Sequence, residues 1–254
     1  MSIRSTVDDV LSRRGLRILN EANLGLAAGD VYLTRLFKEF DFDFVFDVGA
    51  NTGQYALHLT KSLGYAGRIL SIEPIPELIR ALKSALSHEP QWSHMACALD
   101  RTEGTAEFNV MVGSQFSSLL KPAVEFAHSF EGKLRVAATI DVPVRTLDAV
   151  FREAQLKHGF SRSFLKLDTQ GTELPVLEGG PQALSQICAI QTEVSFTAIY
   201  EGAPDFHRIF EFMKEAGYDL SGLFPNNQGH FPRLLEMDAV FVRRDLMPKT
   251  SDIR

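Results

Sequence analysis

The stretch FDFVFDVGANTG, residues 42–53, decides the fold of this 254-residue chain. Its first half is an apolar run that predicts a buried strand over residues 42–48, with the acid Asp47 near its end. Gly49 and Gly53 then permit a tight turn into a helix, because glycine adopts positive φ readily and leaves room for a ligand. A strand, a glycine turn and a helix in this order predict a ligand site at the carboxyl end of a parallel sheet.

The residues of the turn favour one class of ligand. A dinucleotide-binding turn reads G-x-G-x-x-G, because pyrophosphate rests on bare backbone N–H groups at a helix N-terminus. Here Asn51 takes the place of the middle glycine, and Asp47 precedes the first glycine by two residues. A carboxylate there repels pyrophosphate but attracts an ammonium or sulfonium charge, and S-adenosylmethionine carries both. The predicted cofactor-binding residues here are Asp47, Gly49, Asn51 and Gly53. Asp47 and the backbone of Gly49 meet the amino acid moiety of the donor, and Asn51 and Gly53 shape the turn.

Two further acids are expected at the same cofactor. The segment GRILSIE, residues 67–73, predicts the next parallel strand, and Glu73 follows Gly53 by 20 residues. An acid at this offset accepts the ribose hydroxyls of an adenosine, in S-adenosylmethionine as in NAD. A solvated residue before a turn is the structural alternative for Glu73. Asp100 follows a third predicted strand, 93–99, and is placed near the adenine amine, although it equally suits the start of a turn.

Composition and charge limit the kind of protein. Hydrophobic residues make up 45% and charged residues 23% of the chain, as in a globular protein with a sizeable core. The net charge of −6 and the lack of a basic stripe argue against nucleic acid as a partner. No apolar run approaches the roughly 18 residues of a membrane helix, and the N-terminus lacks the apolar centre of a secretory signal. Cys97 and Cys188 have no metal spacing, so we expect buried thiols in a cytoplasmic protein.

The order of apolar and amphipathic segments predicts an α/β fold. Strands at 42–48, 68–72 and 93–99 alternate with helices at 54–63 and 75–86, which implies a parallel sheet with right-handed crossovers. The pattern resumes with strands at 164–168 and 189–194, a helix at 205–216 and two final strands at 218–223 and 239–243. The whole is a Rossmann-like, mostly parallel seven-stranded sheet with helices on both faces, as in class I methyltransferases. We divide the chain into an N-terminal helical segment (1–40), this domain (41–245) and a tail (246–254).

Two parts of the chain stand outside the regular alternation. An extra β insertion follows the third strand, with strands predicted at 104–112 and 135–144. Between them, residues 113–133 are rich in serine and aromatic residues, and we interpret them as a lid on the substrate side, with a surface loop as the alternative. The N-terminal helical segment either covers part of the cleft or packs on the edge of the sheet.

A series of motifs runs in order from residue 42 to residue 193. They read DVGANTGQY (47–55), IEPIP (72–76), ALDRTEG (98–104), VRTLD (144–148), LKLDTQGTE (165–173), VLEGG (176–180) and Glu193. With these motifs the chain resembles the FkbM-type S-adenosylmethionine-dependent methyltransferases. The resemblance implies methyl transfer from S-adenosylmethionine, with S-adenosylhomocysteine as product, to an oxygen of a sugar, polyketide or other small metabolite. Relatives commonly read D-x-E-G-x-E after the fourth strand, and here Gln170, which cannot take up a proton as a carboxylate does, replaces the first glutamate.

Three residues are expected to act on the methyl acceptor. Asp168 and Glu193 end neighbouring parallel strands, where this fold places its reactions, and Lys166 shares a sheet face with Asp168. Asp168 is the leading candidate for a base that accepts a hydroxyl proton. A structural ion pair is the alternative for this group. Together with Glu173 the carboxylates would suit a divalent metal, but we do not expect one, because Gln170 reduces the negative charge.

Two functions of other classes compete with this interpretation. One is an NAD-dependent oxidoreductase, which shares the ribose-binding acid but is disfavoured by Asn51 and Asp47. The other is a non-catalytic module that binds S-adenosylmethionine and acts through partners. The expected partner is a small-molecule or saccharide acceptor, and neither its identity nor the oligomeric state follows from the sequence.

Overall fold

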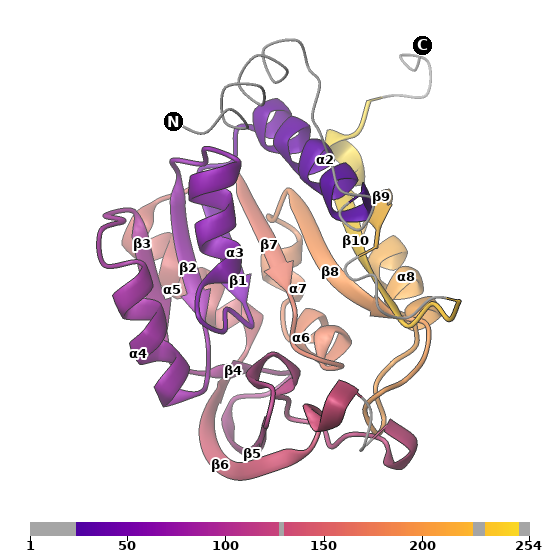
Figure 1. The fold of residues 1–254 in the computed structure, drawn as a ribbon. Coiled ribbons are helices and arrows are strands. Elements are labelled where there is room, and N and C mark those ends of the chain that lie inside the picture. Colours follow the sequence, from indigo (N-terminus) through magenta and orange to yellow (C-terminus); the bar gives the residue numbers. More distant parts are fainter. Residues whose placement is uncertain (1–23, 127–129, 226–231, 249–254) are drawn as a thin grey trace, which may run out of the picture.

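A seven-stranded sheet forms the centre of the structure, a computed structural model that describes residues 24–126, 130–225 and 232–248 (Figure 1). The strand order is β3-β2-β1-β7-β8-β10-β9. Neighbouring strands pair in parallel except β10, which runs antiparallel to β8 and β9. The predicted α/β fold with a mostly parallel seven-stranded sheet is therefore confirmed. The strands are β1 (Phe44–Val48), β2 (Arg68–Ile72), β3 (Trp92–Met95), β7 (Ser163–Leu167), β8 (Ala189–Ser195), β9 (Tyr218–Phe224) and β10 (Glu236–Arg243).

Helices cover both faces of this sheet. Successive side chains of a strand point to opposite faces, so Phe44 and Phe46 of β1 lie in one core and Val45 lies in the other. Burial on both faces explains the continuous apolar runs by which the strands were predicted. The Val45 face is covered by α2 (Leu24–Phe40), α3 (Gln54–Leu57), the π-turn η2 (His58–Ser62) and α4 (Pro76–Ala85). The other face is covered by α5 (Leu147–His158), α6 (Glu173–Glu178), α7 (Pro181–Leu184) and α8 (Phe206–Glu215).

Local sequence signals set the ends of the longer helices. The Thr146 hydroxyl accepts the Ala149 N–H and begins α5, and the Asp205 carboxylate accepts the Arg208 N–H at the start of α8. Such caps satisfy backbone donors that have no partner inside the helix. Gly159, at a φ of 65°, takes the left-handed conformation that ends α5.

The insertion forms a second, three-stranded sheet with the order β4-β6-β5. Its strands are β4 (Ala98–Leu99), β5 (Gly104–Met111) and β6 (Val136–Arg145), so both predicted insertion strands are confirmed. The prediction of one strand over 93–99 was wrong. After Met95, whose carbonyl accepts the Glu73 N–H, the chain leaves the main sheet, and Ala98 and Leu99 pair with β6 instead. Three short 3₁₀ turns link β5 to β6: η3 (Ser114–Phe116), η4 (Val124–Phe126) and η5 (Phe130–Gly132).

Helix α2 lies along the outer strand β9 (Figure 1). Its Tyr32 hydroxyl donates to the Ser221 hydroxyl, and the Tyr32 ring packs on Phe224 at a centroid distance of 4.9 Å. Leu26 of α2 also lines the cavity described in the next subsection. Helix α2 therefore packs on the sheet and also covers part of that cavity. The first part of the predicted helical segment, residues 1–23, lies outside the described residues. Among the residues described, no helix is long and apolar enough to cross a lipid bilayer.

Candidate functional site

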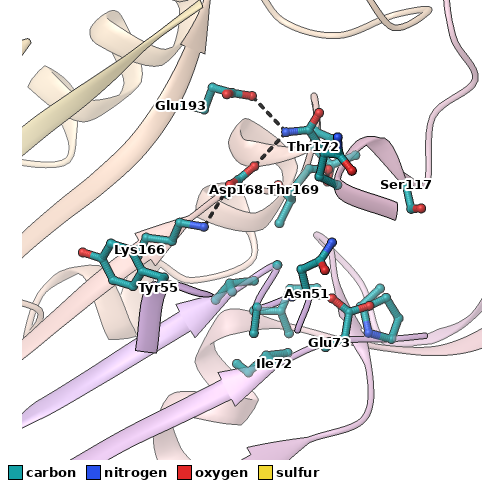
Figure 2. A pocket seen from close by; sticks show the side chains of 18 of the residues that line it. Asn51, Tyr55, Ile72, Glu73, Ser117, Lys166, Asp168, Thr169, Thr172 and Glu193 are labelled. Carbon is teal, nitrogen blue, oxygen red and sulfur yellow. Dashed lines mark hydrogen bonds and ion pairs between the residues drawn. The ribbon is translucent and has the colours of Figure 1, made fainter. Parts of the chain in front are cut away.

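A cavity of about 570 Å³ opens at the carboxyl ends of the parallel strands. Residues at the ends of β1, β2, β7 and β8 line it, as expected for an open α/β sheet. Because β10 is antiparallel, its beginning lies at the same edge, and Glu236 and Asp238 join the lining. Figure 2 shows Asn51 and Glu73 on one side of the space and Lys166, Asp168 and Glu193 on the other.

The glycine turn after β1 is held tightly to its neighbours. Gly49 has a φ of 78°, and a Cβ placed there would lie 1.8 Å from the carbonyl oxygen of Asp168. Its N–H donates to the Ile72 carbonyl at 3.0 Å, so the turn is fixed between β2 and β7. Gly53, at a φ of 90°, begins α3 and lies against Leu86, and it does not line the cavity. Gly49 is therefore required by the approach of two backbones, whereas Gly53 serves only to shape the turn.

Glu73 connects this turn to the cavity. Its two carboxylate oxygens accept one backbone N–H each, from Asn51 and from Ile75, both at 2.9 Å. The side chain is buried, and desolvation raises its pKa to about 7 in spite of these two bonds. A carboxylate oxygen accepts more than one hydrogen bond, so both oxygens can still receive a ribose hydroxyl.

One end of the cavity is apolar and lies beside Glu73. Its walls come from β2, from the β3–β4 connection and from the insertion, and they include Pro74, Cys97, Leu99, Phe108 and Leu119. An apolar space beside a buried acid suits an adenosine, with the base against the apolar walls and the ribose at the carboxylate. Asp100, predicted near the adenine, does not line this space; its carboxylate accepts the N–H of Arg101 in the following turn.

Asp47 is fully buried and does not line the cavity. One oxygen accepts the Ser71 hydroxyl at 3.1 Å, while Oδ1 has no hydrogen-bond partner within the described part of the chain. Burial raises the pKa of Asp47, and the charge of Lys166 opposes this rise. The predicted contact of Asp47 with the donor is therefore not supported by the lining of the cavity. The carboxylate acts instead on Lys166, its neighbour in the β1–β7 register.

The three residues predicted at the acceptor lie close together. Lys166 Nζ donates to Asp168 Oδ2 at 3.0 Å, and burial opposes the lysine charge while Asp168 and Asp47 stabilise it, so that its pKa rises. Gln170 Nε2 donates to Asp168 Oδ1 at 2.7 Å and to Glu193 Oε2 at 3.2 Å. Burial, with the charges of Glu236 and Asp168, raises the pKa of Glu193 well above its usual value. The side chain of Asp168 is 40% exposed, whereas Glu193 is buried. A ligand in the cavity can therefore reach the carboxylate of Asp168 more easily than that of Glu193.

Sequence reasoning missed the polar residues that β10 and β8 bring to the site. Asp238 accepts a bond from Gln191 Nε2 at 3.0 Å, and the Tyr55 hydroxyl donates to Gln191 Oε1 at 2.8 Å. Glu236 also lines the cavity, and its Oε1 has no hydrogen-bond partner among the described residues. The sequence did contain a signal for Glu236 and Asp238. The two acids lie two residues apart at the start of an otherwise apolar strand, so their side chains point to the same face.

Glu173 and the insertion shape the loop around the acids. The buried Glu173 carboxylate accepts the N–H groups of Thr169 and Gly171 and does not line the cavity. Residues 114–117 of the insertion do line it, and the Ser114 hydroxyl accepts a bond from Asn51 Nδ2 at 3.2 Å. The insertion thus forms one wall of the site, and a lid-like movement stays a prediction. Among the described residues, no group of three or more His, Cys, Asp or Glu is arranged to hold a metal ion.

The buried carboxyl groups of the cavity should make the stability of the folded protein depend on pH. Desolvation raises the pKa of Glu236 to about 7, above the value it has in an unfolded chain. Between these values the folded protein holds more protons than the unfolded one, so stability is full at low pH and falls as pH rises through about 7. We expect E236Q to raise the melting temperature by a few degrees near about pH 8 and to leave it unchanged near about pH 5. Differential scanning fluorimetry checks this, with E211Q, which changes an exposed acid of α8, as the control; an equal shift at both pH values contradicts it.

Comparison with known proteins finds a family model and solved structures that resemble this chain. A family model described as the methyltransferase FkbM domain matches residues 47–220. The crystal structure of a methyltransferase FkbM from Methylobacillus flagellatus aligns with a TM-score of 0.51 at 17% identity, covering 79% of this chain. This chain spans only 44% of that protein.

Two further solved structures show weaker likeness, and the curated proteins gave no match. A putative RNA methyltransferase from Pyrococcus horikoshii aligns with a TM-score of 0.44 at 12% identity, covering 86% of this chain and 84% of that one. Fibrillarin from Aeropyrum pernix, solved with natively bound S-adenosylmethionine, aligns with a TM-score of 0.43 at 11% identity, covering 78% and 66%.

Proposed function

Since the chain belongs to the FkbM family of methyltransferases, we propose that it methylates a hydroxyl group of a small molecule or a sugar. S-adenosylmethionine is the cofactor of these enzymes and supplies, when bound, a methyl group on a positively charged sulfur. The observation that carries the proposal is a single cavity with an apolar end beside Glu73 and an exposed carboxylate, Asp168, at its other end. The first suits the nucleoside of the donor, and the second suits a hydroxyl that must lose its proton.

The residues fit the donor in three respects. The Glu73 carboxylate keeps acceptor capacity for the ribose hydroxyls, and the apolar walls at Pro74 and Leu99 can take the adenine. Gly49, Ala50 and Asn51 line the same cavity, and we place the amino acid moiety of the donor beside this turn. Carboxylates at the far end, led by Asp168, favour a cationic donor by Coulomb attraction.

On the acceptor side, we propose that Asp168 is the base that accepts the proton of the hydroxyl group. Its Oδ2 is paired with Lys166 and its Oδ1 receives Gln170, so the carboxylate is held in one orientation at the cavity. A positioned base contributes roughly 10²–10⁴-fold to rate, and alignment of two bound reactants contributes more, up to about 7–11 kcal/mol in favourable cases. We assign Lys166 to fixing this base and Glu193 to orienting the acceptor.

The rival functions differ in the ligand they require. An NAD-dependent oxidoreductase must place a pyrophosphate near the turn, but the cavity beside it contains Asp168, Glu193, Glu236 and Asp238. These acids disfavour a diphosphate and support the methyl donor. A non-catalytic module would bind the donor without needing the Lys166–Asp168 pair.

The donor site is tested by replacing Glu73. Calorimetry of the wild type is expected to show binding of S-adenosylmethionine and S-adenosylhomocysteine and none of NAD. The E73A variant loses a charged acceptor for two hydroxyls, so its Kd for S-adenosylhomocysteine should rise roughly 10- to 100-fold. E73Q keeps one acceptor oxygen and should lie between the two. E77A, which removes an exposed acid on α4, is the control and should bind as the wild type does; tight NAD binding in place of the methyl donor would refute the proposal.

The location, the kind of acceptor and the domain bounds are also part of the proposal. Both cysteines are free thiols in the structure, which supports a reducing, cytoplasmic location. The net charge of −6 supports a small acceptor over nucleic acid. We propose the domain bounds expected from the sequence, with an N-terminal segment at 1–40, a methyltransferase domain at 41–245 and a tail at 246–254.

A further inference from the structure

The side chain of Gln170 lies between two carboxylates of the cavity. Gln170 Nε2 donates to Asp168 Oδ1 at 2.7 Å and to Glu193 Oε2 at 3.2 Å. Carboxylate oxygens at these distances accept hydrogen bonds, so the NH₂ group must face them. Its two hydrogens satisfy one acid each.

Contacts on the opposite side fix this amide in place. Gln170 Oε1 lies 2.8 Å from the Tyr200 hydroxyl, which also lies 2.8 Å from the Phe116 carbonyl oxygen. The Gln170 carbonyl accepts the Ser118 hydroxyl at 2.8 Å, and the residue has a φ of 56°, a left-handed conformation that a non-glycine residue seldom adopts. Gln170 is also buried. A residue held in this conformation by bonds at both ends is fixed by its surroundings.

Two carboxylates so close to one bridging atom repel each other, and the Lys166 charge on Asp168 offsets only part of this, because Asp168 still raises the pKa of Glu193. Left alone, one of them would take up a proton, because like charges raise each other's pKa. A divalent cation relieves this repulsion in many acid clusters, since its preferred ligands are oxygens. Here the amide hydrogens occupy that position, so both acids are bridged by a group that carries no net charge.

We propose that Gln170 is a positioning residue that replaces a divalent metal, holding Asp168 and Glu193 through its amide. The bridge ties both acids to the insertion through Ser118 and to the segment after β8 through Tyr200. That the held carboxylate serves as the base rests on the proposed function; that the amide occupies the place of a cation does not.

The test uses Mn²⁺ as the probe, with binding followed by electron paramagnetic resonance. In Q170E a third carboxylate replaces the amide, so we expect this variant to bind Mn²⁺ at least tenfold more tightly than the wild type. Its melting temperature should fall below that of the wild type without metal and recover with Mn²⁺, which a merely structural role of the side chain would not produce. Q182E, the same change at an exposed site on α7, should gain no metal binding. Equal affinity of wild type and Q170E, lost in both when Asp168 is changed to Asn, would overturn the proposal.

A second measurement does not depend on the stability of Q170E. In the ¹⁵N-labelled wild type, the side-chain NH₂ signals of Gln170, assigned by their loss in Q170L, should shift as the neighbouring acids titrate. Added Mn²⁺ should broaden them no more than the signals of Gln182. Selective broadening would show that a cation reaches the acids and would overturn the proposal. None of these readouts requires methyl transfer or donor binding, so failure of the proposed function would be seen separately, in the calorimetry of S-adenosylhomocysteine.

Discussion

The D168N variant is expected to lose roughly 10²–10⁴-fold in turnover while its Kd for S-adenosylhomocysteine changes little. Asparagine keeps the size of the side chain and can still accept a bond from Lys166, but it cannot take a proton from an acceptor hydroxyl. Donor binding should persist because Glu73 and the glycine turn are unchanged. The measurement is release of S-adenosylhomocysteine with an acceptor selected from a panel of hydroxylated sugars and small metabolites, beside calorimetry of the same samples.

Two variants show whether this loss is specific to the base. D141N removes an exposed carboxylate on β6 and should keep full turnover. E193Q should raise KM more than it lowers kcat, because Glu193 is assigned to orienting the acceptor. Full turnover in D168N would remove Asp168 from the proton transfer, and a loss of donor binding in that variant would show that it holds the cofactor instead.

The G49A variant is expected to be the most destabilising change at the donor site. The new Cβ would lie 1.8 Å from the Asp168 carbonyl oxygen, a backbone atom that moves only with β7, and the φ of 78° adds strain of its own. We expect a loss of about 3 kcal/mol or more in the free energy of unfolding, and loss of S-adenosylhomocysteine binding. Urea unfolding followed by the fluorescence of Trp92, the single tryptophan, measures the first effect.

The matched control for this change is G64A. Gly64 has a similar φ of 70°, but no atom lies within 4 Å of the Cβ it would gain. Its cost should be the backbone strain alone, about 1 kcal/mol. If G49A and G64A were equally mild, the close approach of the turn to β7 would not be a constraint on the fold.

Much of the main sheet was predictable because its strands are buried on both faces. Runs such as 42–48 are apolar for that reason, and the turn at Gly49 follows from the backbone geometry that only glycine allows there. The end of the third strand was not predictable, because Ala98 and Leu99 are apolar in either sheet and only their pairing with β6 separates them from β3.

The candidate site was predicted in part. Lys166 and Asp168 were predicted together because side chains two residues apart in a strand point to the same face of the sheet. The donor contact of Asp47 stays a prediction: its side chain is fully buried and does not line the cavity, although its register partner Lys166 does. Glu236 and Asp238 were missed because the last strand was predicted only from residue 239, whereas β10 begins at Glu236 and carries both acids on one face.

The two ends of the cavity come from separate stretches of the chain. The apolar end and its acid are built by residues between Val48 and Leu119, and the acidic end by residues between Lys166 and Asp238. They meet where the Asp168 backbone contacts Gly49. On the proposed function, variation in the second stretch should therefore change the choice of acceptor, while recognition of the methyl donor by the first stretch is retained.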